Sequence, residues 1–332
     1  GGGRGMNQLI ALFQDAIVFG TVILFGALGE ILTQKSGNLN LGVPGIMYLG
    51  GIAGLMGAFY YENAVETPSK FLCILIGLVC SFALAAVGGL VYSFLTITLR
   101  ANQNVTGLTL TIFGSGFANF FGGSLNKLAG GVGQIHVEAT SAAFRASVPV
   151  LSEIGVVGKI LFSYGFMAYA AILIAILMNR FFSKSAMGLS LRAVGENPGT
   201  ADAAGIDVIR YKYLATCIGA GISGFGGLYY TMDYIKGTWA SDGTIEKLGW
   251  LAVALVIFAT WKPLNAIWGA YLFGVLYWAY FYIEGLTRSS QEIFKMVPYV
   301  VTILVLIFVS FRKKKENLGP ASLGLSYFRE ER

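Results

Sequence analysis

Long apolar runs alternate with short polar segments along almost the whole chain. A membrane-spanning helix needs about 20 mostly apolar residues. Nine segments meet or nearly meet this length, namely residues 9–32, 40–61, 71–99, 104–123, 160–182, 213–232, 246–262, 264–283 and 297–311. We therefore expect an all-α polytopic membrane protein with about nine, or ten, transmembrane helices.

The second of these segments begins with an irregular, polar sequence. Residues 37–45 contain two asparagines, three glycines and Pro44, which removes a backbone donor and clashes with the preceding helical turn. Irregular backbone at membrane depth is tolerated only where it faces protein or a water-filled cavity. We expect a broken or re-entrant second span. The alternatives are a helix entrance at the cytoplasmic interface and a broken helix that lines a solute path.

The composition agrees with a membrane protein. Hydrophobic residues make up 55% of the 332-residue chain and charged residues only 12%, whereas a soluble domain carries about 25% charged residues. This balance excludes an ordinary cytosolic enzyme, a disordered protein and a secreted disulfide scaffold. The net charge of +6 is interpreted as an orientation signal rather than a nucleic-acid surface.

The positive charges predict the orientation and the domain limits. With the N-terminus outside, fourteen Lys and Arg residues lie inside and nine outside, as the positive-inside rule favours. Residues 1–5, ahead of Met6, are interpreted as a cloning scar, with no cleavable signal peptide after them. A transmembrane domain is expected over residues 6–312, with a basic cytoplasmic tail over residues 313–332. We expect a multi-pass protein of the cell membrane with a cytoplasmic C-terminus.

Uncharged polar residues are the candidates for a solute path. Asn104, Thr111 and Asn119 fall close to one helical stripe, which suits either an uncharged polar solute or interhelical hydrogen bonds. Ionisable groups inside the spans are scarce, which argues against coupling to an ion gradient. The path is predicted to contain Asn38, Asn40, Asn104, Thr106, Thr111 and Asn119.

The longest cytoplasmic segment, residues 183–212, contains signals for one short helix over residues 198–204. Asn197 is a good N-cap, Pro198 suits the first helical position, and Gly205 suits the position after the last turn. A helix of two turns is unstable alone. We therefore expect it either to insert into a partner's groove or to form a capped surface turn.

Four sequence blocks resemble one transporter family. The run from Arg192 to Pro198, followed by Ala203-Ala204-Gly205-Ile206, resembles the coupling-loop signature of ATP-binding-cassette importer permeases. The branch is the one that serves simple sugars, branched-chain amino acids and nucleosides. Residues 29–47 resemble the first conserved block of the nucleoside-type permeases, residues 219–227 the glycine-rich helix after the loop, and residues 261–274 the late tryptophan-proline block. Together these blocks cover roughly residues 20–312.

This resemblance implies a set of partners. The chain would be one of two membrane subunits, working with two ATPase subunits, an extracytoplasmic solute-binding lipoprotein and a second permease of related but different sequence. The chain has no G-x-x-x-x-G-K-[ST] motif. ATP and Mg²⁺ would therefore bind to the ATPase subunits, and no cofactor and no nucleic acid to this chain. The coupling residues would be Arg192, Glu196, Asn197, Pro198, Asp202, Ala203, Ala204 and Gly205.

Arg192, Glu196 and Asp202 would make polar contacts at the rim of the ATPase groove, while the alanines fill it. Trp239 and Tyr234, in an outer loop, are candidates for contact with the binding protein. Nucleosides are the expected solute, with simple sugars as the alternative. A stand-alone channel or facilitator explains the hydrophobicity equally well, but not the capped loop helix. A membrane-embedded enzyme has little support, because His136 is the only histidine and has no metal-ligand spacing.

Overall fold

The computed structural model describes residues 2–312 and 314–331. Gly1, at the start of the expected cloning scar, lies outside the described residues, as do Lys313 and Arg332 of the expected tail. Within the described ranges the regular structure is helical, and the one β-bridge joins His136 and Thr238. The expected all-α class is confirmed.

One helix forms in each of the nine apolar segments. These helices are α1 (Gly2–Lys35), α2 (Val43–Ala64), α3 (Lys70–Ser93), α4 (Gln103–Leu128), α7 (Phe166–Lys184), α10 (Val208–Tyr229), α11 (Thr244–Phe258), α12 (Pro263–Trp278) and α14 (Val297–Arg312). A π-helical turn extends α3 over Phe94–Thr98 and α10 over Tyr230–Tyr234. The connections contain shorter helices, namely α5 (Glu138–Arg145), α6 (Gly155–Leu161), α8 (Ala186–Glu196), α9 (Pro198–Ala203) and α13 (Arg288–Lys295).

Five helical segments are long and apolar enough to cross a membrane by length and composition. They are residues 2–35, 43–64, 70–98, 166–184 and 288–312. By contrast, α11 has 15 residues and α12 has 16, so each is about 22–24 Å long against a hydrocarbon core of about 30 Å. The count of nine or ten spans stays a prediction.

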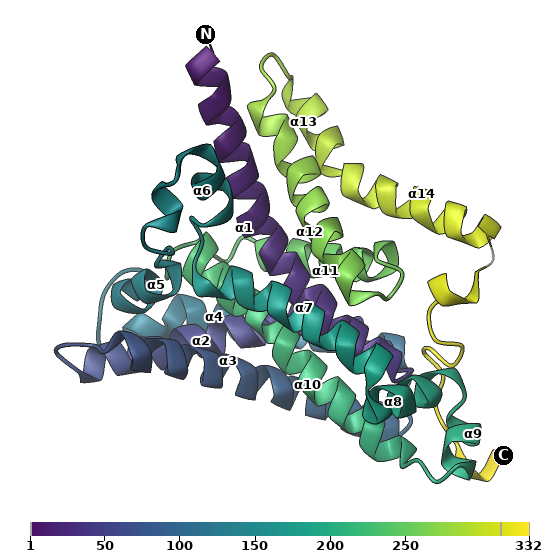
Figure 1. The fold of residues 1–332 in the computed structure, drawn as a ribbon. Coiled ribbons are helices and arrows are strands. Elements are labelled where there is room, and N and C mark those ends of the chain that lie inside the picture. Colours follow the sequence, from purple (N-terminus) through teal and green to yellow (C-terminus); the bar gives the residue numbers. More distant parts are fainter. Residues whose placement is uncertain (1, 313, 332) are drawn as a thin grey trace.

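Helix α1 runs through the middle of the molecule and organises the other long helices (Figure 1). It packs against α10, α12, α11 and α7, while α10 packs on α2 and α3, and α2 packs on α4. The N-terminus lies at one end of the molecule, and the C-terminus lies beside α9 at the opposite end. We call this second region, which contains α8, α9 and the C-terminal residues, the α9 end.

The second span is not broken. Residues 36–42 are non-helical, and α2 then runs without interruption from Val43 to Ala64, with Pro44 in its first turn. Proline is tolerated there because the first-turn N–H groups have no intrahelical partner. The break that we expected within the span is therefore wrong, and the irregular residues form an entrance to the helix. We call residues 36–42 the entrance loop.

The central helices meet backbone to backbone at glycines. A Cβ added to Gly50 of α2 would lie 2.4 Å from the Cα of Gly224 in α10, and one added to Gly227 of α10 would lie 1.8 Å from the carbonyl oxygen of Met47. Ser223 of α10 adds a hydrogen bond to the carbonyl oxygen of Gly26 at 3.0 Å. Small residues permit such close helix crossings in a bilayer, so the glycines fix the separation of α1, α2 and α10.

The substitution Gly227→Ala tests this close packing. The added methyl group would overlap the Met47 carbonyl and push α2 away from α10, at a cost of about 1–3 kcal/mol. We expect a lower midpoint of thermal unfolding for the detergent-purified protein. The matched control is Gly116→Ala, because nothing lies within 4 Å of a Cβ at Gly116. Equal midpoints for the two variants would contradict the packing argument.

Candidate functional site

Helix α9 is a single capped helix, formed where the sequence predicts it. Asn197 Oδ1 accepts a hydrogen bond from the Thr200 backbone N–H at 3.0 Å, and Pro198 occupies the first helical position. Gly205 has a φ of +87°, which ends the helix at little cost for glycine. The expected helix over residues 198–204 is confirmed, with its last residue one position earlier.

A small apolar cluster attaches α9 to the long helices. Ala201 of α9 is buried against Val194 of α8 and Val208 of α10, and Tyr327 packs on the same cluster. Asp207 begins α10 as an N-cap, accepting the backbone N–H of Arg210 at 3.1 Å. Ala203 and Ala204 remain exposed. The helix thus presents a small-residue surface on a firmly held base.

The charged residues of this region differ in their surroundings. Arg192 and Glu196 are exposed, so their expected contacts with a partner stay predictions. The Asp202 side chain is only 14% exposed, and its Oδ2 accepts a hydrogen bond from the Tyr327 hydroxyl at 2.7 Å. Arg329 Nε lies 3.2 Å from the same oxygen. Asp202 therefore holds the C-terminal residues, a contact that the sequence did not indicate.

The entrance loop is buried, and side chains from the surrounding helices pair its backbone groups. The N–H of Leu39 donates to Gln103 Oε1 at 2.7 Å, and the N–H of Asn40 donates to Glu30 Oε1 at 3.1 Å. The carbonyl of Leu41 accepts from Thr111 Oγ1 at 3.0 Å. Asn40 Oδ1 accepts the N–H of Gly42 at 2.8 Å. These bonds satisfy a backbone that no helix ladder serves.

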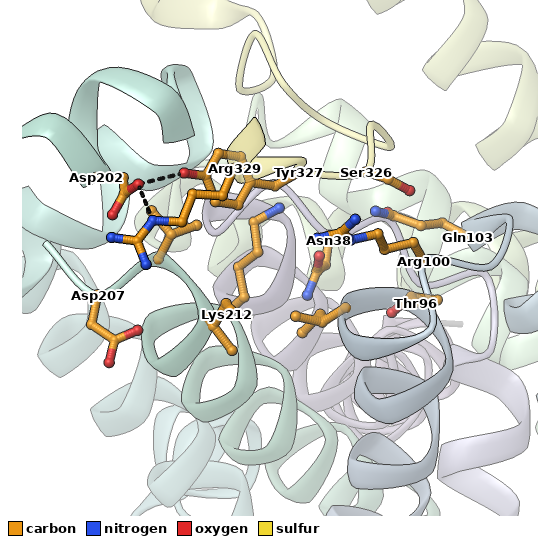
Figure 2. Close-up of a pocket in the computed structure, with 13 residues that line it drawn as sticks. Asn38, Thr96, Arg100, Gln103, Asp202, Asp207, Lys212, Ser326, Tyr327 and Arg329 are labelled. Carbon is orange, nitrogen blue, oxygen red and sulfur yellow. Dashed lines mark hydrogen bonds and ion pairs between the residues drawn. The ribbon is translucent and has the colours of Figure 1, made fainter. Parts of the chain in front are cut away.

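A small polar cavity of about 90 Å³ lies next to the entrance loop at the α9 end. Figure 2 shows its polar side chains converging from the entrance loop, the α3–α4 connection, α9, α10 and the C-terminal residues. They are Asn38, Thr96, Arg100, Gln103, Asp202, Asp207, Lys212, Ser326, Tyr327 and Arg329. We call this space the polar cavity.

Two buried groups make the polar cavity suited to a hydrogen-bonding guest. Asn38 is fully buried, and its Nδ2 donates to Thr216 Oγ1 at 2.8 Å, whereas its Oδ1 has no partner among the described residues. Lys212 lines the same space and is only 2% exposed. A hydrogen-bond acceptor and a donor therefore lie together at the wall of this small cavity.

The six residues predicted for the solute path do not lie together. Asn38 lines the polar cavity, whereas Asn40 and Thr111 bond within or to the entrance loop. Thr106 is buried and donates to the carbonyl of Asn102, and Asn104 is exposed on α4. Asn119 accepts from Trp239 Nε1 at 3.2 Å. Thr111 and Asn119 thus make hydrogen bonds to other segments of the protein, which is the alternative role for this polar stripe.

Trp239 is only 3% exposed, because its ring packs against Gly122 of α4 and beside Tyr48 of α2. The expected contact of Trp239 with a binding protein is therefore wrong. Tyr234 is partly exposed and stacks on Tyr230. His136 is exposed and lies 3.2 Å from Glu138.

Sequence reasoning missed four residues that build the α9 end. Gln103 stands in a run of three amides, and Lys212 directly precedes the apolar run over residues 213–232. The position of each residue beside an apolar run was a usable signal. A charged or amide group is costly to bury there unless it is paired or functional. Tyr327 and Arg329 gave no signal, because their contacts depend on the C-terminal residues folding back onto α9.

Comparisons with known proteins agree with the resemblance of the sequence blocks. The model of a family described as branched-chain amino acid transport system / permease component matches residues 12–306. A putative glucose ABC transporter permease protein of Haloferax volcanii is 32% identical over 98% of this chain and 99% of its own length. A nucleoside ABC transporter permease protein of Lactococcus lactis is 29% identical, covering 98% and 99%. A guanosine ABC transporter permease protein of Bacillus subtilis is 27% identical, covering 90% and 92%. No solved structure matches the chain significantly.

Replacement of Glu30 tests the hydrogen bonds of the entrance loop. Glu30 Oε1 accepts two hydrogen bonds, one from the Asn40 N–H at 3.1 Å and one from Gln34 Nε2 at 2.8 Å. Glu30→Ala would leave two buried donors unpaired, at a cost of about 1–3 kcal/mol each. We expect a clearly lower midpoint of thermal unfolding in detergent. Glu30→Gln keeps an acceptor oxygen and should lose less than half as much, whereas equal losses would contradict this role.

Proposed function

The chain belongs to the family of permease components of branched-chain amino acid transport systems, and from this premise we propose that it carries a small neutral solute inward, driven by ATP hydrolysis on separate subunits. It is a membrane transport subunit and not an enzyme. The observation that supports coupling to ATP is the form of α9. This helix is capped, its alanine face is exposed, and the Val194–Ala201–Val208 cluster anchors it to α10.

Helix α9 docks into a groove of the ATPase subunit in this proposal. Ala203, Ala204 and the exposed Thr200 enter the groove, and Arg192 and Glu196 make polar contacts at its rim. Asn197, Pro198 and Gly205 hold the helix in shape, and Asp202 holds it to the C-terminal residues. ATP and Mg²⁺ bind to the ATPase subunits. Because Ala201 is packed between α8 and α10, a pull on α9 moves the start of α10.

The remaining partners and the orientation follow from the same proposal. A second permease of related sequence completes the membrane pair, and an extracytoplasmic binding protein delivers the solute. The excess of Lys and Arg on the loops expected inside supports a cytoplasmic α9 end. The described C-terminal residues lie at this end beside α9, which supports a cytoplasmic C-terminus.

Nucleosides are the proposed solute. The nucleoside and guanosine permeases similar to this chain support this choice. Asn38 carries the free acceptor Oδ1, and it is the path residue with the strongest support. Simple sugars are the second candidate, favoured by the similarity to the putative glucose permease.

Bulky charges on the exposed face of α9 test the docking. Ala203→Glu combined with Ala204→Glu should abolish co-purification of the ATPase and ATP-driven uptake, because two carboxylates cannot enter an apolar groove without a large desolvation cost. The membrane level of the permease should not change. The control is Ala186→Glu, at an exposed position that begins α8, which should retain both properties. Normal ATPase binding and uptake in the double variant would refute the proposal.

Replacement of Asn38 tests the solute path. Asn38→Ala removes the cavity acceptor, and we expect uptake of radiolabelled guanosine to fall by about fivefold, since one hydrogen bond contributes about 1 kcal/mol net. Asn7→Ala is the control, because Asn7 is exposed on α1 and does not line the polar cavity. Uptake of labelled glucose but not of guanosine by the wild-type complex would favour the sugar alternative. Equal guanosine uptake by both variants would contradict the path.

A further inference from the structure

The C-terminal residues fold back over the α9 end and attach first to α8 and the entrance loop. The N–H of Ser322 donates to the Gly195 carbonyl at 3.0 Å, and Ser322 Oγ donates to the Glu196 carbonyl at 3.1 Å. The N–H of Gly324 donates to the Gly37 carbonyl at 3.0 Å. Residues 322–324 are therefore fixed where α8 meets the entrance loop.

The next residues form part of the wall of the polar cavity, which Ser326, Tyr327 and Arg329 line. We call residues 325–330 the strap. On one side, Tyr327 and Arg329 hold Asp202 of α9, and the Tyr327 ring packs on the cluster around Ala201 (Figure 2). On the other side, the strap reaches the α3–α4 connection. The strap thus joins α9 to the opposite wall of the cavity.

The two attachments of the strap differ in strength. At α9, the contacts of Asp202 to the strap are short, 2.7 Å to Tyr327 and 3.2 Å to Arg329, with Asp202 14% and Arg329 70% exposed. On the opposite side, Gln103 Nε2 at the start of α4 donates to the Leu325 carbonyl at 3.4 Å, and Arg100 of the α3–α4 connection lies 3.7 Å from Glu330, whose side chain is 77% exposed. An exposed ion pair contributes only about 0–1 kcal/mol. Arg100 also lies over the Phe328 ring at 4.6 Å. The α3–α4 attachment is the weaker one.

We propose that the strap is a second coupling element, in which Tyr327 and Arg329 act as positioning residues that make the cover of the polar cavity follow the movement of α9. This rests on the proposed docking of α9 to an ATPase. When α9 moves, the strap stays with Asp202, separates from Arg100 and Gln103, and opens the polar cavity to the cytoplasm. Asn38 and Lys212 then become accessible to a solute that leaves toward the cytoplasm. ATP hydrolysis thereby sets both the movement of the long helices and the opening of the exit.

Variants at the strong attachment test the proposal in the complete complex, with its ATPase and binding protein. Tyr327→Phe combined with Arg329→Gln removes both contacts to Asp202 but keeps the aromatic ring in its cluster. We expect the ATPase to co-purify at the wild-type level and ATP hydrolysis to continue, while guanosine uptake per ATP hydrolysed falls about fivefold or more. Arg329→Lys alone, which keeps the positive charge, should largely retain the wild-type ratio. The control Arg210→Gln removes an exposed cation at the same end and should not change it.

A thiol in the cavity wall measures the opening directly. Thr96 is 2% exposed and lines the polar cavity. In a background with Cys73, Cys80 and Cys217 replaced by alanine, Thr96→Cys should react with a polar maleimide several-fold faster when Arg100→Gln weakens the strap. Addition of ATP should also raise the rate in the complex, and this rise should vanish in the Tyr327→Phe/Arg329→Gln variant.

Three results would overturn the strap proposal, and they differ from failure of the proposed function. An unchanged uptake per ATP in the Tyr327→Phe/Arg329→Gln variant would exclude a coupling role. Loss of ATPase co-purification in that variant would make the strap part of the docking surface instead. A labelling rate of Thr96→Cys that does not depend on Arg100 would show that the strap does not cover the cavity. Failure of the proposed function itself would appear in the α9 variants Ala203→Glu and Ala204→Glu.

Discussion

The structure depends on an irregular stretch of backbone buried among helices. Residues 36–42 have no helix ladder, yet they lie inside the protein, so every N–H and C=O group there needs a partner from elsewhere. Glu30 of α1, Gln103 and Thr111 of α4 and the C-terminal Gly324 supply them. The entrance loop therefore binds together α1, α4 and the C-terminal residues. Their relative positions at the α9 end follow from this one requirement.

In the middle of the molecule, by contrast, the helices are held by close backbone contacts at glycines. Where α2 crosses α10 at Gly50 and Gly224, and α10 approaches Met47 at Gly227, the backbones touch without side chains between them. Such contacts leave little room for sliding. Movement is easier at the α9 end, where exposed polar contacts join the strap to Arg100 and Gln103. A rigid centre with an adjustable end suits a permease driven from one side.

The sequence predicts the elements governed by local rules and misses those that depend on distant partners. Apolar runs place nine helices, and Asn197, Pro198 and Gly205 set the ends of α9, because hydropathy and capping act over a few residues. The course of residues 322–330 depends on contacts to Gly37, Arg100 and Asp202, and Trp239 is buried by Gly122 far away in sequence. The polar residues Asn104, Thr111 and Asn119 of α4 do not form one site, because they face different neighbours. The course of residues 322–330, the burial of Trp239 and the surroundings of the α4 polar residues all depend on residues far away in the sequence. A local sequence pattern does not predict such contacts.

The central claim is that energy enters this chain through α9 from an ATP-hydrolysing partner. The most direct test is uptake of labelled guanosine into proteoliposomes that hold the permease pair and its ATPase, with the binding protein and solute outside and ATP enclosed. The account predicts accumulation above the external concentration that requires enclosed ATP and stops when the ATPase is omitted. Equilibration of the solute at the same rate without ATP or ATPase would identify a stand-alone facilitator and contradict the account.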